Sequence, residues 1–206
     1  MATTIVGRAA CLAALPFLLL AGAVNAAGFS VAPVRVNFDA TQRSDVVRLT
    51  NDSADEVSVQ ADAVSWRQDE AGGVLYEATT DLLIVPRIVS IPPGETQVVR
   101  IGRLVAADPA RQGAYRIFFT ELAPPTEPGE TTTLNFRLRL GIPVFMAPAE
   151  GGAPELSLVR SDRTDSGLEV VLNNTGNTHL QLLTLRSGRS IGRGAHEIEH
   201  TLGAYL

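Results

Sequence analysis

Two short motifs near the C-terminus of the chain have the residue types and spacing of catalytic sites. His196-Glu197-Ile198-Glu199-His200 matches the zinc-protease pattern, in which a helix places two histidines on one face with a glutamate beside them. Glycines border the segment on both sides, only six residues follow it, and His179 is the one other histidine. A helix is not expected in that context, so a polar strand or loop is the better interpretation and no metal site is predicted.

The second motif, Gly188-Arg189-Ser190-Ile191-Gly192, matches the nucleophile elbow of serine hydrolases. Such a serine follows a strand, precedes a helix, and needs an acid and then a histidine far downstream. Only fourteen residues follow Gly192, so we expect a glycine-rich β-turn here. The sequence has neither a phosphate-binding glycine loop nor paired cysteines of metal-site type. It therefore predicts a protein that is not an enzyme and has no catalytic residues, cofactor or nucleotide.

A long strand candidate at 131–146 has a regular apolar face. Its apolar side chains are Leu134, Phe136, Leu138 and Leu140, which we call the apolar ridge, and they alternate with asparagine and arginine. In an interior strand this ridge would fill the core of a sandwich, and the alternation by itself favours that position. In an edge strand it would be exposed beside unpaired backbone groups and could pair with another chain.

The remaining chain after residue 29 reads as all-β, with period-2 patterns and no long helical stripe. Strands are predicted at 31–38, 45–50, 57–66, 81–90, 96–101, 113–122 and 131–146. Turn residues separate them, including Pro92-Pro93-Gly94. Seven strands in about 120 residues, with turns at regular spacing, are typical of an immunoglobulin-like sandwich.

A compositional break at 149–154 predicts a linker between two domains. We expect one domain at 27–148 and a second at 155–206, with strands at 155–159, 168–173 and 179–185. Since a sandwich of this kind takes about 100 residues, the second β domain is expected to be short or incomplete.

The first 26 residues have the three parts of an export signal. Arg8 gives the positive start, the apolar stretch 11–24 follows, and small residues up to Ala26 suit cleavage after that residue. A membrane anchor is the competing interpretation, but a spanning helix needs about 20 apolar residues and Pro16 interrupts a shorter run. Cleavage also removes Cys11, the only cysteine, so the mature chain is expected to form no disulfide of its own.

The charge of the chain argues against a nucleic-acid partner. The formal net charge is −5, whereas phosphate binding favours a basic face. All seventeen basic residues are arginine. Every cationic contact must therefore be made by a guanidinium group, which can hold a carboxylate with two parallel hydrogen bonds.

Six blocks of sequence, in order, give the chain a family resemblance. They are residues 30–38, 49–52, 91–101, 115–119, 134–148 and 173–179. On these blocks the chain resembles the periplasmic, PapD-like pilus-assembly chaperones, which have two immunoglobulin-like domains. The resemblance implies donor-strand complementation, in which a pilus subunit lacks its last strand and the chaperone supplies it. The apolar ridge would then enter the subunit's groove, and the subunit would pass to an outer-membrane usher without ATP.

The resemblance also implies a site for the subunit's terminal carboxylate. Arg35 matches the first-strand arginine that holds this carboxylate in the cleft between the domains, and an ordinary surface ion pair is its alternative role. Pro143 stands where the family has a lysine. Chains without that lysine resemble the archaic branch, which assembles thin pili or spore-coat-like subunits, and there Arg87 is a plausible substitute. A secreted structural or adhesive β-sandwich, such as a pilus subunit, is the alternative function.

Overall fold

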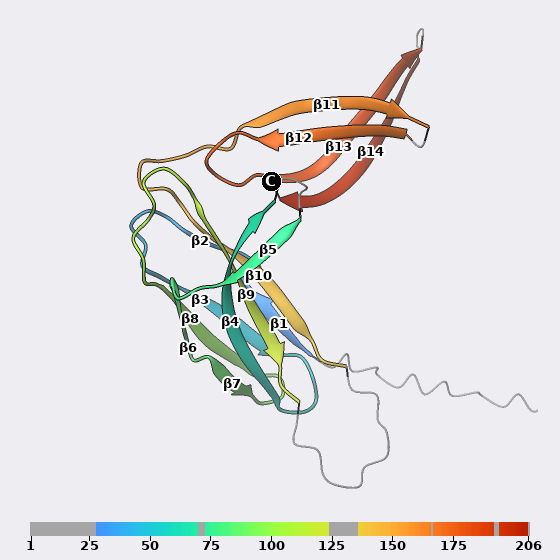
Figure 1. The fold of residues 1–206 in the computed structure, drawn as a ribbon. Coiled ribbons are helices and arrows are strands. Elements are labelled where there is room, and N and C mark those ends of the chain that lie inside the picture. Colours follow the sequence, from blue (N-terminus) through green and yellow to red (C-terminus); the bar gives the residue numbers. More distant parts are fainter. Residues whose placement is uncertain (1–27, 70–72, 124–135, 166, 192–193, 206) are drawn as a thin grey trace, which may run out of the picture.

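The computed structural model describes residues 28–69, 73–123, 136–165, 167–191 and 194–205. These residues form fourteen β-strands and no helix, so the predicted all-β class is confirmed (Figure 1). None of the described residues belongs to a helix long and apolar enough to cross a membrane. The predicted export signal lies outside the described residues.

Two sheets form a sandwich in the first part of the chain. The four-stranded sheet has the order β1 (Phe29–Ala32), β3 (Ser44–Asn51), β8 (Thr96–Arg103) and β6 (Leu82–Val85). The six-stranded sheet has the order β2 (Val36–Phe38), β10 (Arg139–Met146), β9 (Gly113–Glu121), β4 (Val57–Gln68) and β5 (Val74–Ala78), and β7 (Ile88–Ile91) also pairs with β4. All pairs are antiparallel except β2 with β10, which is parallel.

Two hairpins follow the sandwich. They are β11 (Leu156–Thr164) with β12 (Gly167–Asn174), and β13 (Gln181–Ile191) with β14 (Gly194–Tyr205). Figure 1 shows both hairpins beyond one end of the sandwich.

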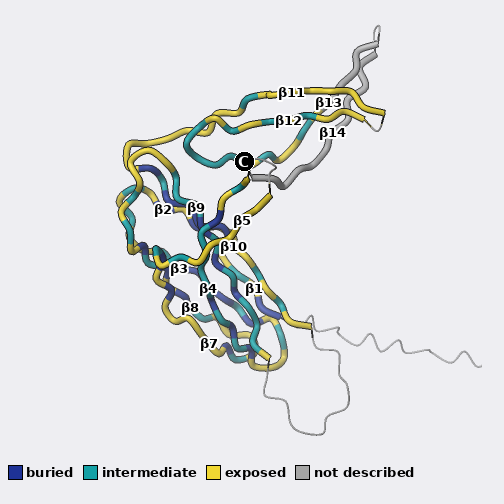
Figure 2. The backbone as a smooth tube through the Cα atoms, viewed as in Figure 1, coloured by how far each residue is buried: buried dark blue, intermediate teal, exposed yellow. Residues whose placement is uncertain are grey.

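The core lies between the two sheets, because alternate residues of each strand point inward. Leu49 of the four-stranded sheet and Phe119 of the six-stranded sheet are completely buried. Figure 2 shows buried backbone along both sheets, whereas none of the described residues of β11 and β12 is buried. Among the residues whose burial is described, the packed core is therefore that of the first sandwich.

Two predicted strands are each split in two by a proline. Residues 31–38 form β1 and β2 on either side of Pro33, and residues 81–90 form β6 and β7 on either side of Pro86. The bonds before both prolines are cis. Since proline has no N–H to donate to a ladder, neither strand continues past it. At each position the chain leaves the four-stranded sheet and enters the six-stranded one.

Other predictions also differ from the structure, and one of them is the β-turn expected at 188–192, because β13 continues as a paired strand to Ile191. β5 was not predicted, and all five of its residues are exposed. The strand predicted at 131–146 begins at Arg139, residues 136–138 precede it without strand pairing, and residues 131–135 lie outside the described part of the chain.

Candidate partner-binding surface

The apolar ridge divides between solvent and the protein's own core. Phe136 is 82% exposed, whereas Leu138 and Leu140 are half-buried and pack against the core. The N–H of Leu138 donates to Oε2 of Glu121 at 3.2 Å, and the N–H of Glu121 donates to the carbonyl of Leu138 at 2.9 Å. The segment therefore stays beside the end of β9. Leu134 lies outside the described residues.

β10 is an interior strand along one half and an edge strand along the other. It pairs with β9 along its whole length, from Arg139 to Met146. Its other side pairs with β2 only at Val144, Phe145 and Met146. Among the described residues, 139–143 therefore have backbone groups without a strand partner on that side, which we call the open edge. Phe136 lies just before it in the chain.

The outer face of the six-stranded sheet has a layer of aromatic and arginine side chains. We call these Trp66, Tyr76, Arg116, Phe118 and Arg139 the arginine–aromatic cluster. Nη1 of Arg116 donates to the hydroxyl of Tyr76 at 2.7 Å, and its guanidinium carbon lies 5.6 Å from the ring centroid of Trp66 and 5.7 Å from that of Tyr76. The guanidinium of Arg139 lies 3.9 Å from the ring centroid of Phe118. These contacts hold two cations over one sheet face.

A glycine makes room for this cluster. A Cβ atom at Gly141 would lie 2.9 Å from the ring of Phe118 and 3.2 Å from Cδ of Arg116. Both are flexible side chains, but both are held by the ring contacts of the cluster. A side chain at Gly141 would therefore displace part of the cluster.

Arg35 lies immediately before β2 and is exposed. It shares an environment with His179 of the C-terminal part, since its charge is one of the two causes that lower the pKa of that histidine. None of the ion pairs among the described residues includes Arg35.

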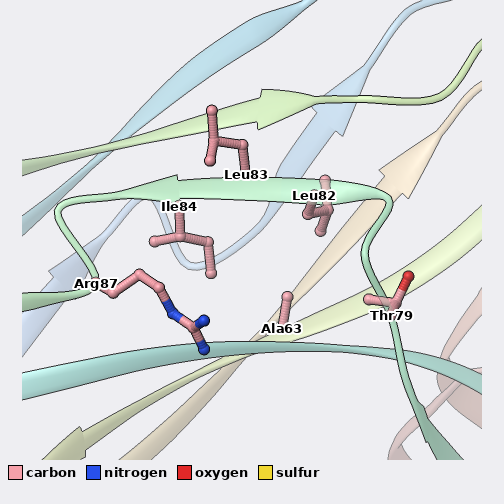
Figure 3. A pocket seen from close by; sticks show the side chains of 6 residues that line it. All are labelled: Ala63, Thr79, Leu82, Leu83, Ile84 and Arg87. Atoms are coloured by element: carbon pink, nitrogen blue, oxygen red, sulfur yellow. The ribbon is translucent and has the colours of Figure 1, made fainter.

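Arg87 lies at the corner between β6 and β7. Its Nη2 donates to Oδ1 of Asp62 at 2.6 Å, and its carbonyl accepts from the N–H of Ala61. Figure 3 shows its side chain reaching from this corner toward β4, beside a cavity of about 120 Å³ that Leu82 and Ile84 help to line. Both side chains of the ion pair are well exposed, so the pair itself contributes little stability.

The structure does not bring Arg35 and Arg87 together. Arg35 precedes β2, at one edge of the six-stranded sheet, and Arg87 precedes β7, beyond β4. Four strand spacings, or about 19 Å at about 4.8 Å each, separate these positions across the sheet.

A joint connects the sandwich to the chain after β12, and we call Gln112, Phe145, Asn177 and His179 the joint residues. The ring of His179 stacks on that of Phe145, with centroids 3.5 Å apart and an interplanar angle of 5°. The N–H of His179 donates to Oε1 of Gln112 at 2.8 Å, and its Nδ1 lies 2.6 Å from the same oxygen. The N–H of Gln112 donates to the carbonyl of Asn177 at 3.0 Å.

Burial at this joint lowers the pKa of His179, and the nearby charge of Arg35 lowers it further. A neutral His179 with its proton on Nδ1 satisfies the acceptor oxygen of Gln112. Sequence reasoning included residues 173–179 only as a block of family resemblance. The joint could have been suspected from two features of the sequence. His179 follows Asn177 closely, and Phe145 is an aromatic residue on the outer face of β10.

Neither catalytic motif has the structural context that it needs. The histidine motif lies in β14, which is a strand, and the zinc-protease pattern requires a helix. Ser190 lies in β13, and the next element is β14 where an elbow would have a helix. No group of three or more metal-ligating side chains occurs among the described residues.

Several solved chaperone structures are similar to this one. The CsuC–CsuE chaperone–tip adhesion subunit complex of archaic Csu pili from Acinetobacter baumannii matches with a TM-score of 0.60 and 20% identity, over 86% of this chain and 88% of that chain. The SafB chaperone in complex with the SafA pilin of Salmonella enterica matches with a TM-score of 0.58 and 14% identity, over 87% of this chain and 83% of that chain. The CupB2 chaperone of Pseudomonas aeruginosa matches with a TM-score of 0.55 and 17% identity, over 86% of this chain and 85% of that chain. At these identities the likeness shows the fold.

A search of curated proteins found no match. The family model described as "Pili and flagellar-assembly chaperone, PapD N-terminal domain" matches residues 28–151, which include the whole first sandwich and the open edge of β10. The chain therefore belongs to the PapD-like pilus-assembly chaperones, a family of chaperones and not of enzymes.

Proposed function

We propose that this protein is a periplasmic chaperone that captures pilus subunits by donor-strand complementation and delivers them to an outer-membrane usher. The observation that carries the proposal is the open edge of β10, with Phe136 exposed directly before it. An incoming strand can satisfy the unpaired backbone groups while an apolar groove covers the aromatic ring. Neither step needs a nucleotide.

The energetics of capture would depend on few side chains. Complete burial of one large apolar side chain such as Phe136 contributes about 1.5–3 kcal/mol before the costs of association. The half-buried Leu138 and Leu140 can add to this only where the partner covers the area that the chaperone's own core leaves exposed. Arg35 and Arg87 are the candidate residues for the subunit's carboxylate.

Two further observations support the cellular setting and the partner class. The export signal predicted at residues 1–26 would bring the chain to the periplasm, with cleavage after Ala26. Two of the similar structures are described as complexes of a chaperone with a tip adhesion subunit or a pilin. A pilus or spore-coat-like subunit is therefore the partner to test first.

Periplasmic co-expression with candidate subunits tests the proposal. The expected result is a stable one-to-one complex that co-purifies with the wild-type chain. If the chain instead assembled with copies of itself and captured none of the subunits, it would be a structural or adhesive protein.

Phe136→Asp should abolish capture and leave folding unchanged. The charge would enter an apolar groove without a partner, which is strongly unfavourable, whereas the free protein exposes this position to water. Co-purification yield and melting temperature are the two measurements. Val98→Asp is the matched control, because Val98 is 49% exposed on β8 of the other sheet and should not affect capture.

A further inference from the structure

We propose that Pro143 determines where a captured strand ends on β10. It stops the ladder between β10 and β2, and it leaves the N–H groups of Arg139 and Gly141 as the donors of β10 that face the partner. The inference rests on the proposed function, because the strand that pairs there is that of the captured subunit. It assigns to Pro143 a role in the backbone ladder that needs no charge at this position.

A hydrogen bond at the end of β9 shows which backbone groups of β10 face β9. The N–H of Glu121 donates to the carbonyl of Leu138 at 2.9 Å, and these residues are opposite each other one step before β10 begins. Along an antiparallel pair, opposite residues alternate between those that exchange hydrogen bonds and those that do not. Pro143 and Arg116 lie an odd number of positions further along, so they form a non-bonded pair.

Two hydrogen bonds with other strands give the same alternation. The N–H of Leu122 donates to the carbonyl of Ser58 at 2.8 Å, so the even-numbered residues of β9 direct their backbone groups to β4 and not to β10. The N–H of Ala147 donates to the carbonyl of Phe38 at 2.8 Å, so the odd-numbered residues of β10 direct theirs to the side of β2. This side includes the open edge.

The backbone nitrogen of Pro143 faces this side but carries no hydrogen. In a longer parallel ladder it would donate to the carbonyl of Val34, two residues before Val36, at which β2 begins. Because that donor is missing, the ladder with β2 stops and the open edge begins at the same position. Proline on an edge strand limits further strand pairing in this way.

Among the residues of β10, Arg139 and Gly141 keep N–H donors on the open side. The N–H groups of Leu140 and Ile142 point to β9, because those residues belong to the bonded pairs of that ladder. A strand that adds to the open edge can therefore pair with Arg139 and Gly141, and β2 occupies the edge beyond Pro143. The captured strand thus has a fixed end.

Amide hydrogen exchange, resolved by residue with NMR, tests this ladder without any substitution. It is measured on the free chain and on its complex with the subunit that co-purifies. In the free chain we expect the amides of Leu140, Ile142 and Phe145 to be protected and those of Arg139 and Gly141 to exchange fast. On capture, exchange at Arg139 and Gly141 should slow by roughly tenfold or more, and the other three amides should change little.

Pro143→Val and Pro143→Ala each restore a backbone N–H at this position and differ in bulk. In the free variants the new amide should be protected, because β2 can extend to the carbonyl of Val34. The extended β2 would also compete with the partner for the backbone of Gly141. Capture should therefore weaken roughly two- to tenfold, the effect of about one hydrogen bond. Equal effects of the two substitutions would support the inference, whereas an effect of only one would assign the cause to bulk and overturn it.

The outcomes separate this inference from the proposed function. If Arg139 and Gly141 become protected on capture but the new amide at position 143 exchanges fast in both free variants, the role of Pro143 is overturned and the proposed function stands. Capture without new protection at Arg139 and Gly141 overturns the inference together with strand addition at this edge. Failure of every subunit to co-purify overturns the inference and the proposed function.

Discussion

Asn51 is the completely buried polar side chain that connects three segments of the sandwich. Its Nδ2 donates to the carbonyls of Ile91 and Asp55 at 2.8 and 2.7 Å, and its Oδ1 accepts from the N–H and hydroxyl of Ser53. Its own carbonyl accepts from the N–H of Gly94, whose positive φ of 71° suits the predicted turn after Pro93. One side chain thus satisfies the backbone of two separate loops.

Asn51→Leu should destabilise the protein by about 2–4 kcal/mol, because buried carbonyl groups would lose their donors and apolar bulk would replace them. Thermal or urea unfolding measures this loss. Asn37→Leu is the control, since Asn37 is exposed on β2. Equal small effects of both substitutions would show that water replaces the lost donors.

Residue type and order could indicate some candidate residues but not their grouping. Arg35 and Phe136 were identified from the sequence, and the structure places both at the surface. The position of Arg116 opposite Pro143 could not be identified in that way, because it depends on the register of β9 with β10. Sequence spacing does not encode register between strands that are far apart in the chain.

At the scale of elements, β10 shows why two opposite interpretations of one alternating pattern can both be partly correct. Its C-terminal half is interior, and the half next to Phe136 is an edge. The alternation of apolar and polar residues is the same in both halves, because it reports which face is buried and not whether a neighbouring strand is present.

Leu138→Asp and Phe136→Asp should therefore behave differently. Leu138 packs against the core, so a charge there should lower the melting temperature as well as capture, by roughly 2 kcal/mol or more of stability. Phe136→Asp should lower capture alone. Comparable melting temperatures for the two variants would contradict this division of the apolar ridge.

Most strands of the sandwich could be predicted from alternation and turn residues, but their assignment to sheets could not. Pro33 and Pro86 each interrupt a predicted strand. The alternation of apolar and polar residues continues on both sides of each proline, so the sequence predicts one strand where the structure has two. β5 was missed because none of its residues is buried, so it leaves no hydrophobic periodicity in the sequence. It is a strand only because β4 extends far enough to pair with it.

At the scale of the whole molecule, the joint residues couple the sandwich to the hairpins. The contacts comprise one ring stack and several hydrogen bonds around Gln112, His179 and Asn177. Arg35, a proposed residue for the partner's carboxylate, also belongs to the surroundings of His179. We therefore expect a substitution of Arg35 to affect the joint as well as the capture of a partner.

The joint should weaken in acid because His179 is held neutral. Its pKa in the folded protein lies below the ordinary value of 6.5, first through burial and then through the charge of Arg35. The unfolded chain then binds a proton more readily than the folded one. The stabilisation is complete above about pH 6.5 and is lost as the pH falls through the lowered pKa of the folded state.

His179→Phe keeps an aromatic ring against Phe145 but cannot titrate. The difference in melting temperature between the wild type and this variant should therefore shrink, or change sign, between pH 8 and pH 5. Both proteins contain His196 and His200, so the titration of those residues cancels in the difference.

Arg35→Ala should lose less stability in acid than the wild type, because removal of the neighbouring charge brings the pKa of His179 closer to its ordinary value. A difference that stays constant across this pH range would mean that protonated His179 is accommodated in the joint, with Gln112 still accepting from Nδ1 and no net cost from Arg35.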